Sequence, residues 1–259
     1  MRDLDGKTIL VSGVGPGLGH DTAKIALREG ASVVAAARQL ERLRGICAEL
    51  DPSGDRIEPV SCDLADPASC GRLIDAAVAR FGRLDGIVHV AAYDTLFGWL
   101  EGADLTEWRN VYEMNVFASL QLIQAALGPL KARGGSIALI GSQSTDLPQV
   151  PQLAYASSKA ALRNLGKQLA VELGPHKIRV NTVVATWMWG PAVQGYVAGV
   201  ASERGVDQQV VIDEIASKMP LRQIPEDDDV AEMACFLMSD RARMVTGQAI
   251  FVNAGEFIS

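Results

Sequence analysis

The sequence predicts an α/β protein built on a doubly wound parallel sheet of about seven strands, with helices on both faces. Two observations predict this fold class. Short apolar runs alternate with segments of helical periodicity from one end of the chain to the other, and such alternation is typical of parallel strands joined by crossover helices. A glycine-rich loop stands at residues 13–19, between the first expected strand and the first expected helix.

The expected elements follow one another in a regular order. Apolar, β-rich runs predict strands at residues 7–12, 32–37, 57–62, 86–91, 136–140, 178–184 and 250–252. Apolar residues at helical spacing predict helices at residues 18–29, 40–50, 67–81, 105–131, 152–173 and 230–238, and Asp66 is the expected N-cap of the helix at 67–81. The long segment 191–219 interrupts this order. We therefore expect a single domain over residues 1–259, with a substrate lid or loop at about residues 186–219.

Composition excludes several classes of function. The chain has 259 residues, of which 48% are hydrophobic, and a net charge of −7. Because acidic and basic residues are interspersed, no basic stripe favours nucleic acid. No apolar run approaches the roughly 20 residues of a membrane span, so we expect no membrane contact and a cytoplasmic protein. The cysteines show no C-x-x-C spacing and the histidines no H-x-x-x-H pair, which favours reduced thiols and no metal site.

The glycine loop indicates a bound dinucleotide. A strict G-x-G-x-x-G does not fit, because its third glycine would fall on Leu18. Instead Gly13, Gly17 and Gly19 form G-x-x-x-G-x-G, with Gly15 inside the loop. A plain glycine turn is the alternative, but the position after the first strand favours a Rossmann fold, in which pyrophosphate binds unpaired N–H groups at the helix start.

The end of the second strand indicates which dinucleotide binds. NAD-binding folds carry an acidic residue there, whereas this chain has Ala37 followed by Arg38. Because a guanidinium can bind a 2′-phosphate, the sequence favours NADP(H). NAD(H) stays possible, since Arg38 could also be a solvated residue at a helix start.

Three polar residues form a candidate catalytic set. Tyr155 and Lys159 are four residues apart in an expected helix, so they project from the same face. Taken alone, this Y-x-x-x-K spacing is weak. Ser142 supports it, because it ends the fifth expected strand at the edge where open α/β sheets bind ligands.

Over nearly its whole length the sequence resembles the short-chain dehydrogenases/reductases. The resemblance rests on motifs that occur together. They are the glycine loop, Cys62-Asp63-Leu64, Asn115, Ser142 thirteen residues before Tyr155, Lys159, and Arg179-Val180-Asn181.

The resemblance implies an NAD(P)-dependent oxidoreductase that transfers a hydride between a nicotinamide and a carbonyl or secondary alcohol. It makes Tyr155 the general acid or base, with Ser142 on the substrate oxygen, Lys159 on the nicotinamide ribose and Asn115 in a proton relay. We expect Lys159 to lower the pKa of Tyr155. The resemblance also places the cofactor against Asp63, Leu64, Ala91, Thr186 and Met188. Each residue also has a structural alternative. Asn115 could be a polar residue within a helix, and Ser142 and Asp63 could each form a turn.

Some motifs depart from the family. His89-Val90-Ala91-Ala92 stands where N-N-A-G is usual, and we expect His89 to fill the structural place of the first asparagine. Ala185-Thr186 replaces a proline-glycine pair, and Gly190 replaces a threonine. Asn253-Ala254-Gly255 replaces Asp-Gly-Gly. A lost hydroxyl at residue 190 predicts a modest cofactor affinity.

Aromatic residues cluster after the fourth and sixth expected strands. They are Tyr93, Phe97, Trp99, Trp187, Trp189 and Tyr196. We interpret them as walls of an apolar pocket for a small ketone or alcohol, with Tyr93, Trp99, Trp187 and Trp189 as candidate substrate contacts. Packing of the lid onto the body is the alternative.

Two rival functions stay open. The first is a non-catalytic dinucleotide-binding scaffold or sensor, which would keep this fold without its chemistry. The second is an enzyme that uses NAD in the oxidative direction. The resemblance also implies a homo-oligomer, either a tetramer or a dimer.

Overall fold

The computed structural model of the protein describes residues 2–148 and 151–258. Within these residues seven strands form one sheet in the order β3-β2-β1-β4-β5-β6-β7, and every neighbouring pair is parallel. The strands are β1 (Thr8–Ser12), β2 (Ser32–Ala37), β3 (Ile57–Ser61), β4 (Gly86–His89), β5 (Gly135–Ser142), β6 (Ile178–Ala185) and β7 (Ala249–Val252). The expected fold class, a doubly wound parallel sheet of about seven strands, is confirmed.

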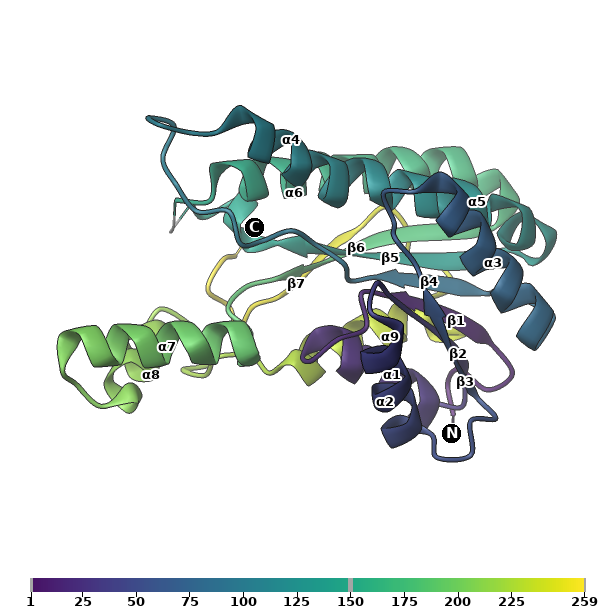
Figure 1. The fold of residues 1–259 in the computed structure, drawn as a ribbon, viewed down its shortest axis with the longest axis horizontal. Coiled ribbons are helices and arrows are strands. Elements are labelled where there is room, and N and C mark those ends of the chain that lie inside the picture. Colours follow the sequence, from purple (N-terminus) through teal and green to yellow (C-terminus); the bar gives the residue numbers. More distant parts are fainter. Residues whose placement is uncertain (1, 149–150, 259) are drawn as a thin grey trace.

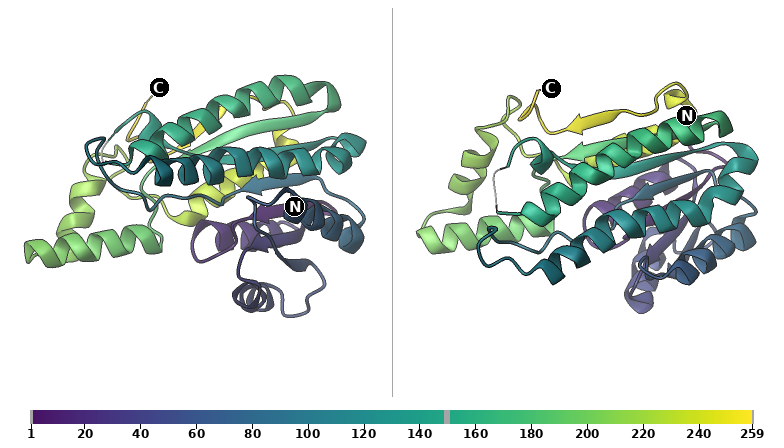
Figure 2. Two further views of the ribbon diagram at one scale, coloured as in Figure 1. Left: turned by 45° about the horizontal axis from the view of Figure 1, so that its top comes forward. Right: turned by 90° about the horizontal axis from the view of Figure 1, so that it is seen from above.

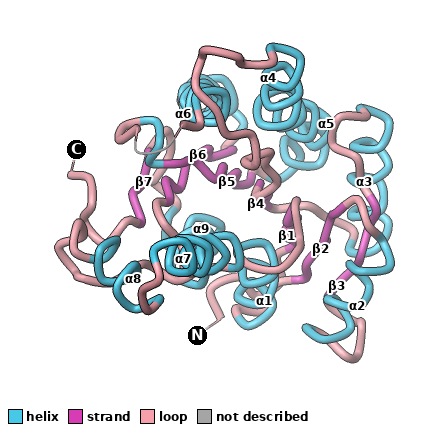
Figure 3. Tube along the Cα trace, turned by 60° about the vertical axis from the view of Figure 1, so that its left-hand side comes forward, coloured by secondary structure: helices cyan, strands magenta, loops and turns pink. Residues whose placement is uncertain are grey.

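Helices cover both faces of the sheet (Figure 1). One face carries α1 (Leu18–Arg28), α2 (Leu40–Leu50) and α9 (Asp227–Met238). The other carries α3 (Pro67–Phe81), α4 (Leu105–Tyr112), α5 (Ala118–Arg133) and α6 (Leu153–Leu173). Figure 3 shows the strands lying between these two helical layers. None of the described helices is long and apolar enough to cross a bilayer.

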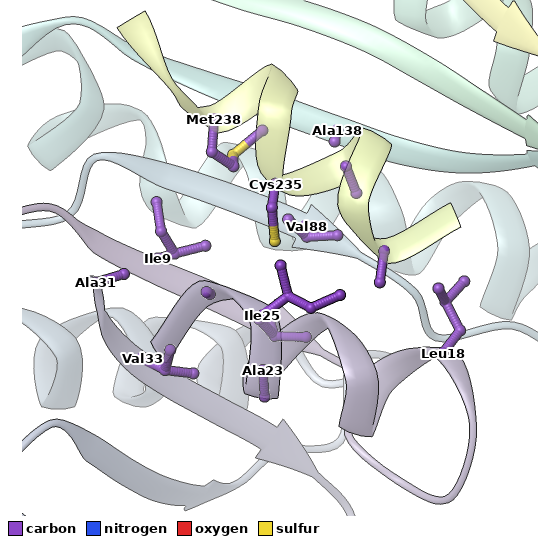
Figure 4. Close-up of a cluster of buried hydrophobic side chains, with 14 of the residues drawn as sticks. Ile9, Leu18, Ala23, Ile25, Ala31, Val33, Val88, Ala138, Cys235 and Met238 are labelled. Carbon is purple, nitrogen blue, oxygen red and sulfur yellow. The ribbon is translucent and has the colours of Figure 1, made fainter. Parts of the chain in front are cut away.

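Each helical layer packs on the sheet through its own apolar core. In Figure 4, Ile9, Val33 and Val88 from the sheet meet Ile25 of α1 and Cys235 of α9. The residues of β1 are all buried, which explains why this strand is apolar without alternation. A second core lies on the other face of the sheet. Burying one such isoleucine or valine contributes about 1.5–3 kcal/mol to folding, so the two cores fix the helical layers on the sheet.

The strand order places the ligand crevice. β1 lies between β2 and β4, so the chain leaves β1 toward β2 on one side and returns to β4 on the other. In open α/β sheets, ligands bind beyond the carboxyl ends of the strands at this reversal. The glycine loop after β1 lies at that point.

One helix differs from the sequence prediction. The helix expected at 105–131 is α4, then a π-helical segment Glu113–Phe117, then α5. The segment 191–219, for which the sequence indicated no regular element, holds two helices, α7 (Pro191–Arg204) and α8 (Gln208–Ala216). They extend to one side of the body (Figures 1 and 2). They have a small apolar core of their own, which includes Val197 and Ile215.

Candidate active site

A cavity of about 610 Å³ lies at the carboxyl edge of the sheet. Its lining comes from the glycine loop, the segment after β4, the end of β5, the start of α6 and the segment between β6 and α7. Leu18, Asp94, Ser142, Tyr155 and Thr186 represent these five parts. The volume is typical of a small-molecule site.

The glycine loop packs so tightly that its pattern has a steric cause. A Cβ on Gly13 would lie 2.5 Å from the Ala91 nitrogen, and one on Gly19 would lie 2.2 Å from the Gly13 oxygen. Gly17 has a φ of 94°, a conformation that favours glycine. A Cβ on Gly15, by contrast, would have no other atom within 4 Å. Gly13, Gly17 and Gly19, the three positions of the looser pattern, are therefore the ones the fold requires.

The start of α1 provides a site for an anion. Its N-cap is Gly17, and no side chain caps it. The first N–H groups of a helix have no partner inside the helix and carry the positive end of its dipole. Pro16, Gly17 and Leu18 line the cavity at this point. These residues fit the pyrophosphate of a dinucleotide, which binds such helix starts.

The ends of β2 and β3 lie beyond this loop and are solvent-exposed. Arg38 is exposed, and no hydrogen bond or ion pair reaches its guanidinium from the described residues. Arg42, four residues on, is exposed and unpaired among the same residues. The sequence prediction missed Arg42, although the i, i+4 spacing from Arg38 was visible. The Asp63 carboxylate accepts a hydrogen bond from the Ala65 N–H at 3.1 Å. This bond closes a turn, which is the structural alternative that the sequence offered for Asp63.

Ser142, Tyr155 and Lys159 lie together. Ser142 ends β5, and its hydroxyl is 2.9 Å from that of Ser144, while Tyr155 lies in the first turn of α6. Ser142 and Tyr155 both line the cavity. Lys159 lies behind them, 2% exposed, with its Nζ 5.7 Å from the centre of the Tyr155 ring. The same Nζ donates a hydrogen bond to the Ile140 carbonyl at 2.8 Å.

The electrostatics of this set differ from the sequence expectation. Burial raises the pKa of Tyr155 to about 12, while the neighbouring Ser142 hydroxyl acts in the lowering direction and the charge of Asp94 raises the pKa further. Burial lowers the pKa of Lys159 to about 8, and Asp94 opposes this shift. We expected Lys159 to lower the pKa of Tyr155. That is not the case in this state, because the ammonium binds the Ile140 carbonyl and desolvation of the phenolate dominates.

Asn115 lies in the π-helical segment and is fully buried. Its Oδ1 accepts from the Tyr93 N–H at 2.7 Å, and its Nδ2 donates to the Tyr93 carbonyl at 3.1 Å and to the Ser158 hydroxyl at 2.9 Å. The side chain therefore joins the segment after β4 to α6. This contact positions the helix that carries Tyr155.

His89 occupies the place of the first asparagine of the family motif. Its two ring nitrogens are 2.7 Å from the Ser12 hydroxyl and 2.8 Å from the Ser119 hydroxyl. Burial lowers the pKa of His89 to about 3, so the ring is neutral. The expectation that His89 fills a structural role is confirmed, since it joins β1, β4 and α5.

Some of the other candidate cofactor and substrate residues line the cavity, and some do not. Those that line it are Thr186, Trp187, Met188, Phe97 and Tyr196. Tyr93, Trp99 and Trp189 do not. The Tyr93 hydroxyl donates to Glu107 at 3.0 Å, Trp99 is 69% exposed, and Trp189 packs against the α7 and α8 core. Leu64 is buried in the sheet core, and the Ala91 N–H donates to the Ser12 carbonyl at 3.1 Å.

Several cavity residues were missed by the sequence prediction. Gln143, next to Ser142, donates to the Glu256 carboxylate at 2.7 Å and accepts from Asn253 at 2.6 Å. The Thr186 hydroxyl donates to the same carboxylate. Asp94 and Asp227 also line the cavity. Their positions depend on tertiary contacts, and the sequence carries no signal for them beyond the places of Asp94 and Gln143 after strands and of Asp227 at a helix start.

Metal ligands do not gather in residues 2–148 and 151–258, since no group of three histidine, cysteine, aspartate or glutamate side chains there could hold an ion. The cysteines at 47, 62, 70 and 235 are buried and unpaired by disulfides.

Comparison with known proteins agrees with this geometry. The profile of a family described as "Enoyl-(Acyl carrier protein) reductase" matches residues 13–256. Carbonyl reductase [NADPH] 2 of Sus scrofa is 33% identical, with all of both chains covered. The 7alpha-hydroxysteroid dehydrogenase of Escherichia coli is 29% identical over 97% of this chain and 94% of the relative. A solved short-chain dehydrogenase/reductase from Mycobacterium ulcerans superposes with a TM-score of 0.89 at 31% identity, covering 98% of this chain and 90% of that one.

The chain belongs to the short-chain dehydrogenase/reductase family. It is an oxidoreductase of this family, which acts on CH–OH and C=O groups with a nicotinamide cofactor. Ser142 and Tyr155 line the same cavity as the uncapped start of α1.

Proposed function

We propose that this short-chain dehydrogenase/reductase interconverts a small, largely apolar ketone and its secondary alcohol, with NADP(H) as the preferred cofactor. The observation that carries the proposal is that Ser142 and Tyr155 line the same cavity as the start of α1. The bound nicotinamide supplies or accepts the hydride.

Tyr155 transfers the proton. A phenol with a pKa of about 12 is protonated at neutral pH, which is the form that donates to a carbonyl oxygen during reduction. Ser142 donates a hydrogen bond to the same oxygen and stabilises the charge that develops on it. Lys159, whose Nζ lies 5.7 Å from the centre of the Tyr155 ring, holds the nicotinamide ribose. Asn115 positions α6 through Ser158.

The preference for NADP(H) is supported by Arg38 and Arg42. Both are exposed, and neither pairs with an acidic side chain in the described part of the chain. Two unpaired guanidinium groups near the end of β2 suit a 2′-phosphate. The relative from Sus scrofa is named for NADPH.

An apolar substrate is supported by the aromatic part of the cavity. Phe97, Trp187 and Tyr196 line it, and the rings of Trp187 and Tyr196 are 5.3 Å apart. Flat apolar walls of this kind suit a cyclic or long-chain ketone. One relative is named for hydroxysteroids.

The test follows NADPH absorbance with a panel of apolar cyclic and linear ketones, in the wild type and in Tyr155→Phe. We expect turnover that the variant lowers about 100- to 10,000-fold. Tyr112→Phe, on α4 and outside the cavity lining, is the matched control and keeps wild-type turnover. If NADPH binds but no ketone or alcohol reacts, and Tyr155→Phe behaves like the wild type, the protein is a non-catalytic dinucleotide-binding protein instead.

A further inference from the structure

Asp227 has an unusual position for a carboxylate. It is the first residue of α9, only 8% exposed, and it lines the cavity. No hydrogen bond or ion pair reaches its carboxylate from the residues that the structure describes. Because Asp227 lines the cavity, a molecule bound there is the natural hydrogen-bond partner of this carboxyl group.

Its surroundings point to the cofactor. A Cβ on Gly17 would lie 3.0 Å from Asp227 Oδ2, and one on Gly190 would lie 2.3 Å from it. Gly17 and Gly190 are the N-caps of α1 and α7, and neither helix has a side-chain cap. Asp227 therefore lies between the starts of α1 and α7, at the place that fits the pyrophosphate.

This contact also explains a departure from the family. Gly190 stands where a threonine is usual, and the Asp227 carboxyl fills the space that a side chain at residue 190 would need. The hydroxyl lost at residue 190 is thus replaced by a polar group that reaches the same region from α9.

We propose that Asp227 is a cofactor-binding residue that, in its protonated form, donates a hydrogen bond to a phosphate oxygen of the dinucleotide, so that binding takes up one proton from solvent. The inference rests on the proposed function, since it needs a bound dinucleotide. An ionised carboxylate would instead repel the phosphates, which carry the same charge.

The charges around Asp227 favour its protonated form. Burial raises its pKa to about 6, with further contributions from Asp21 of α1 and from Glu226 and Asp228 beside it. Lys24 of α1 is 3.9 Å from Asp21 and 3.7 Å from Asp228, and His20 is 2.9 Å from Asp21, so these neighbours are partly compensated. Asp229 is held in the capping box with Glu226, and the first turn of α7 carries no acidic residue.

The experiment is calorimetric titration of the wild type and Asp227→Asn with NAD⁺, from about pH 5.5 to about pH 8.5, in two buffers of different ionisation enthalpy. NAD⁺ is the probe because the 2′-phosphate of NADP⁺ itself titrates near pH 6. We expect the wild-type Kd to rise by up to about tenfold per pH unit above pH 6, with uptake of about one proton. Asp227→Asn should bind without pH dependence, and more tightly than the wild type at high pH, because an amide donates at every pH.

Asp228→Asn is the matched control, since it removes the same charge from a half-exposed neighbour: it should keep the uptake of one proton and the weakening of binding with pH, with the midpoint moved to slightly lower pH. A flat wild-type Kd with no proton uptake would overturn the role of Asp227 and leave the proposed function intact. Binding that strengthens with pH and is lost in Asp227→Asn would overturn it too, because the ionised carboxylate would then be a hydrogen-bond acceptor. If neither NAD⁺ nor NADP⁺ binds at any pH, the proposed cofactor use fails together with this inference.

Discussion

The two ends of the nucleotide crevice are built in different ways. At the reaction end, Ser142, Lys159, Asn115 and His89 all have hydrogen-bond partners inside the protein, and all but Ser142 are buried. At the adenosine end, the Arg38 side chain is exposed and has no partner among the described residues. The reaction end is thus organised before any ligand arrives, whereas the adenosine end depends on charge that the ligand completes. Changes at the first should affect rates, and changes at the second should affect affinity.

The largest effect is expected at the reaction end. Ser142→Ala removes a hydrogen-bond donor to the developing oxyanion, so kcat should fall about 100- to 1,000-fold while the Kd of NADP⁺ stays the same. Steady-state rates and calorimetric titration measure the two quantities. Ser144→Ala, whose hydroxyl is 2.9 Å from that of Ser142, is the control and should change kcat far less. A rise in Kd with an unchanged kcat would contradict the division between the two ends.

The glycine loop at residues 13–19, which lies between the two ends of the crevice, should not tolerate side chains added at Gly13 and Gly19. In Gly19→Ala the new methyl group would lie 2.2 Å from the Gly13 oxygen, so we expect a loss of stability of at least about 1–3 kcal/mol. Chemical unfolding followed by circular dichroism measures this. Gly45→Ala serves as the matched change, because Gly45 lies inside α2 with nothing within 4 Å and should gain about 0.5–1 kcal/mol. Equal stability of the two variants would refute the steric explanation of the loop.

At the adenosine end, Arg38→Ala should weaken NADPH binding by about ten- to a hundredfold, because it removes a charge-assisted contact to the 2′-phosphate. NADH binding should not change, and kcat at saturating NADPH should change little. Fluorescence titration with both cofactors separates these effects. Should NADH bind the wild type more tightly than NADPH, the preference for NADP(H) would be wrong.

The smallest effect is expected behind the reaction end, at His89. This ring has a pKa of about 3 in the folded protein and near 6.5 in an unfolded chain, so the folded state binds fewer protons in between. Stability should therefore fall as pH drops below about 6.5, by about 1 kcal/mol per pH unit. His89→Asn should remove this part of the acid sensitivity in urea unfolding at two pH values. An unchanged acid sensitivity would mean that the ring is charged or exposed.

The same contrast explains what sequence could predict. Periodicity and the glycine loop indicated the sheet, its helices and the start of α1, because these depend on local pattern. The combination of Ser142, Tyr155 and Lys159 was visible because the family keeps its spacing. Asp94, Gln143 and Asp227 were not, since each reaches the cavity only through packing of distant segments. The raised pKa of Tyr155 was missed for the same reason, because it depends on burial and on the charge of Asp94.

The helices α7 and α8 pack on each other around their own apolar core, apart from the two cores of the sheet. A unit that carries its own core can be exchanged between relatives without disturbing the scaffold beneath it. Grafting residues 187–219 from a relative would then transfer substrate preference while thermal stability stays with the recipient. The same independence lets evolution try new substrates at little risk to folding.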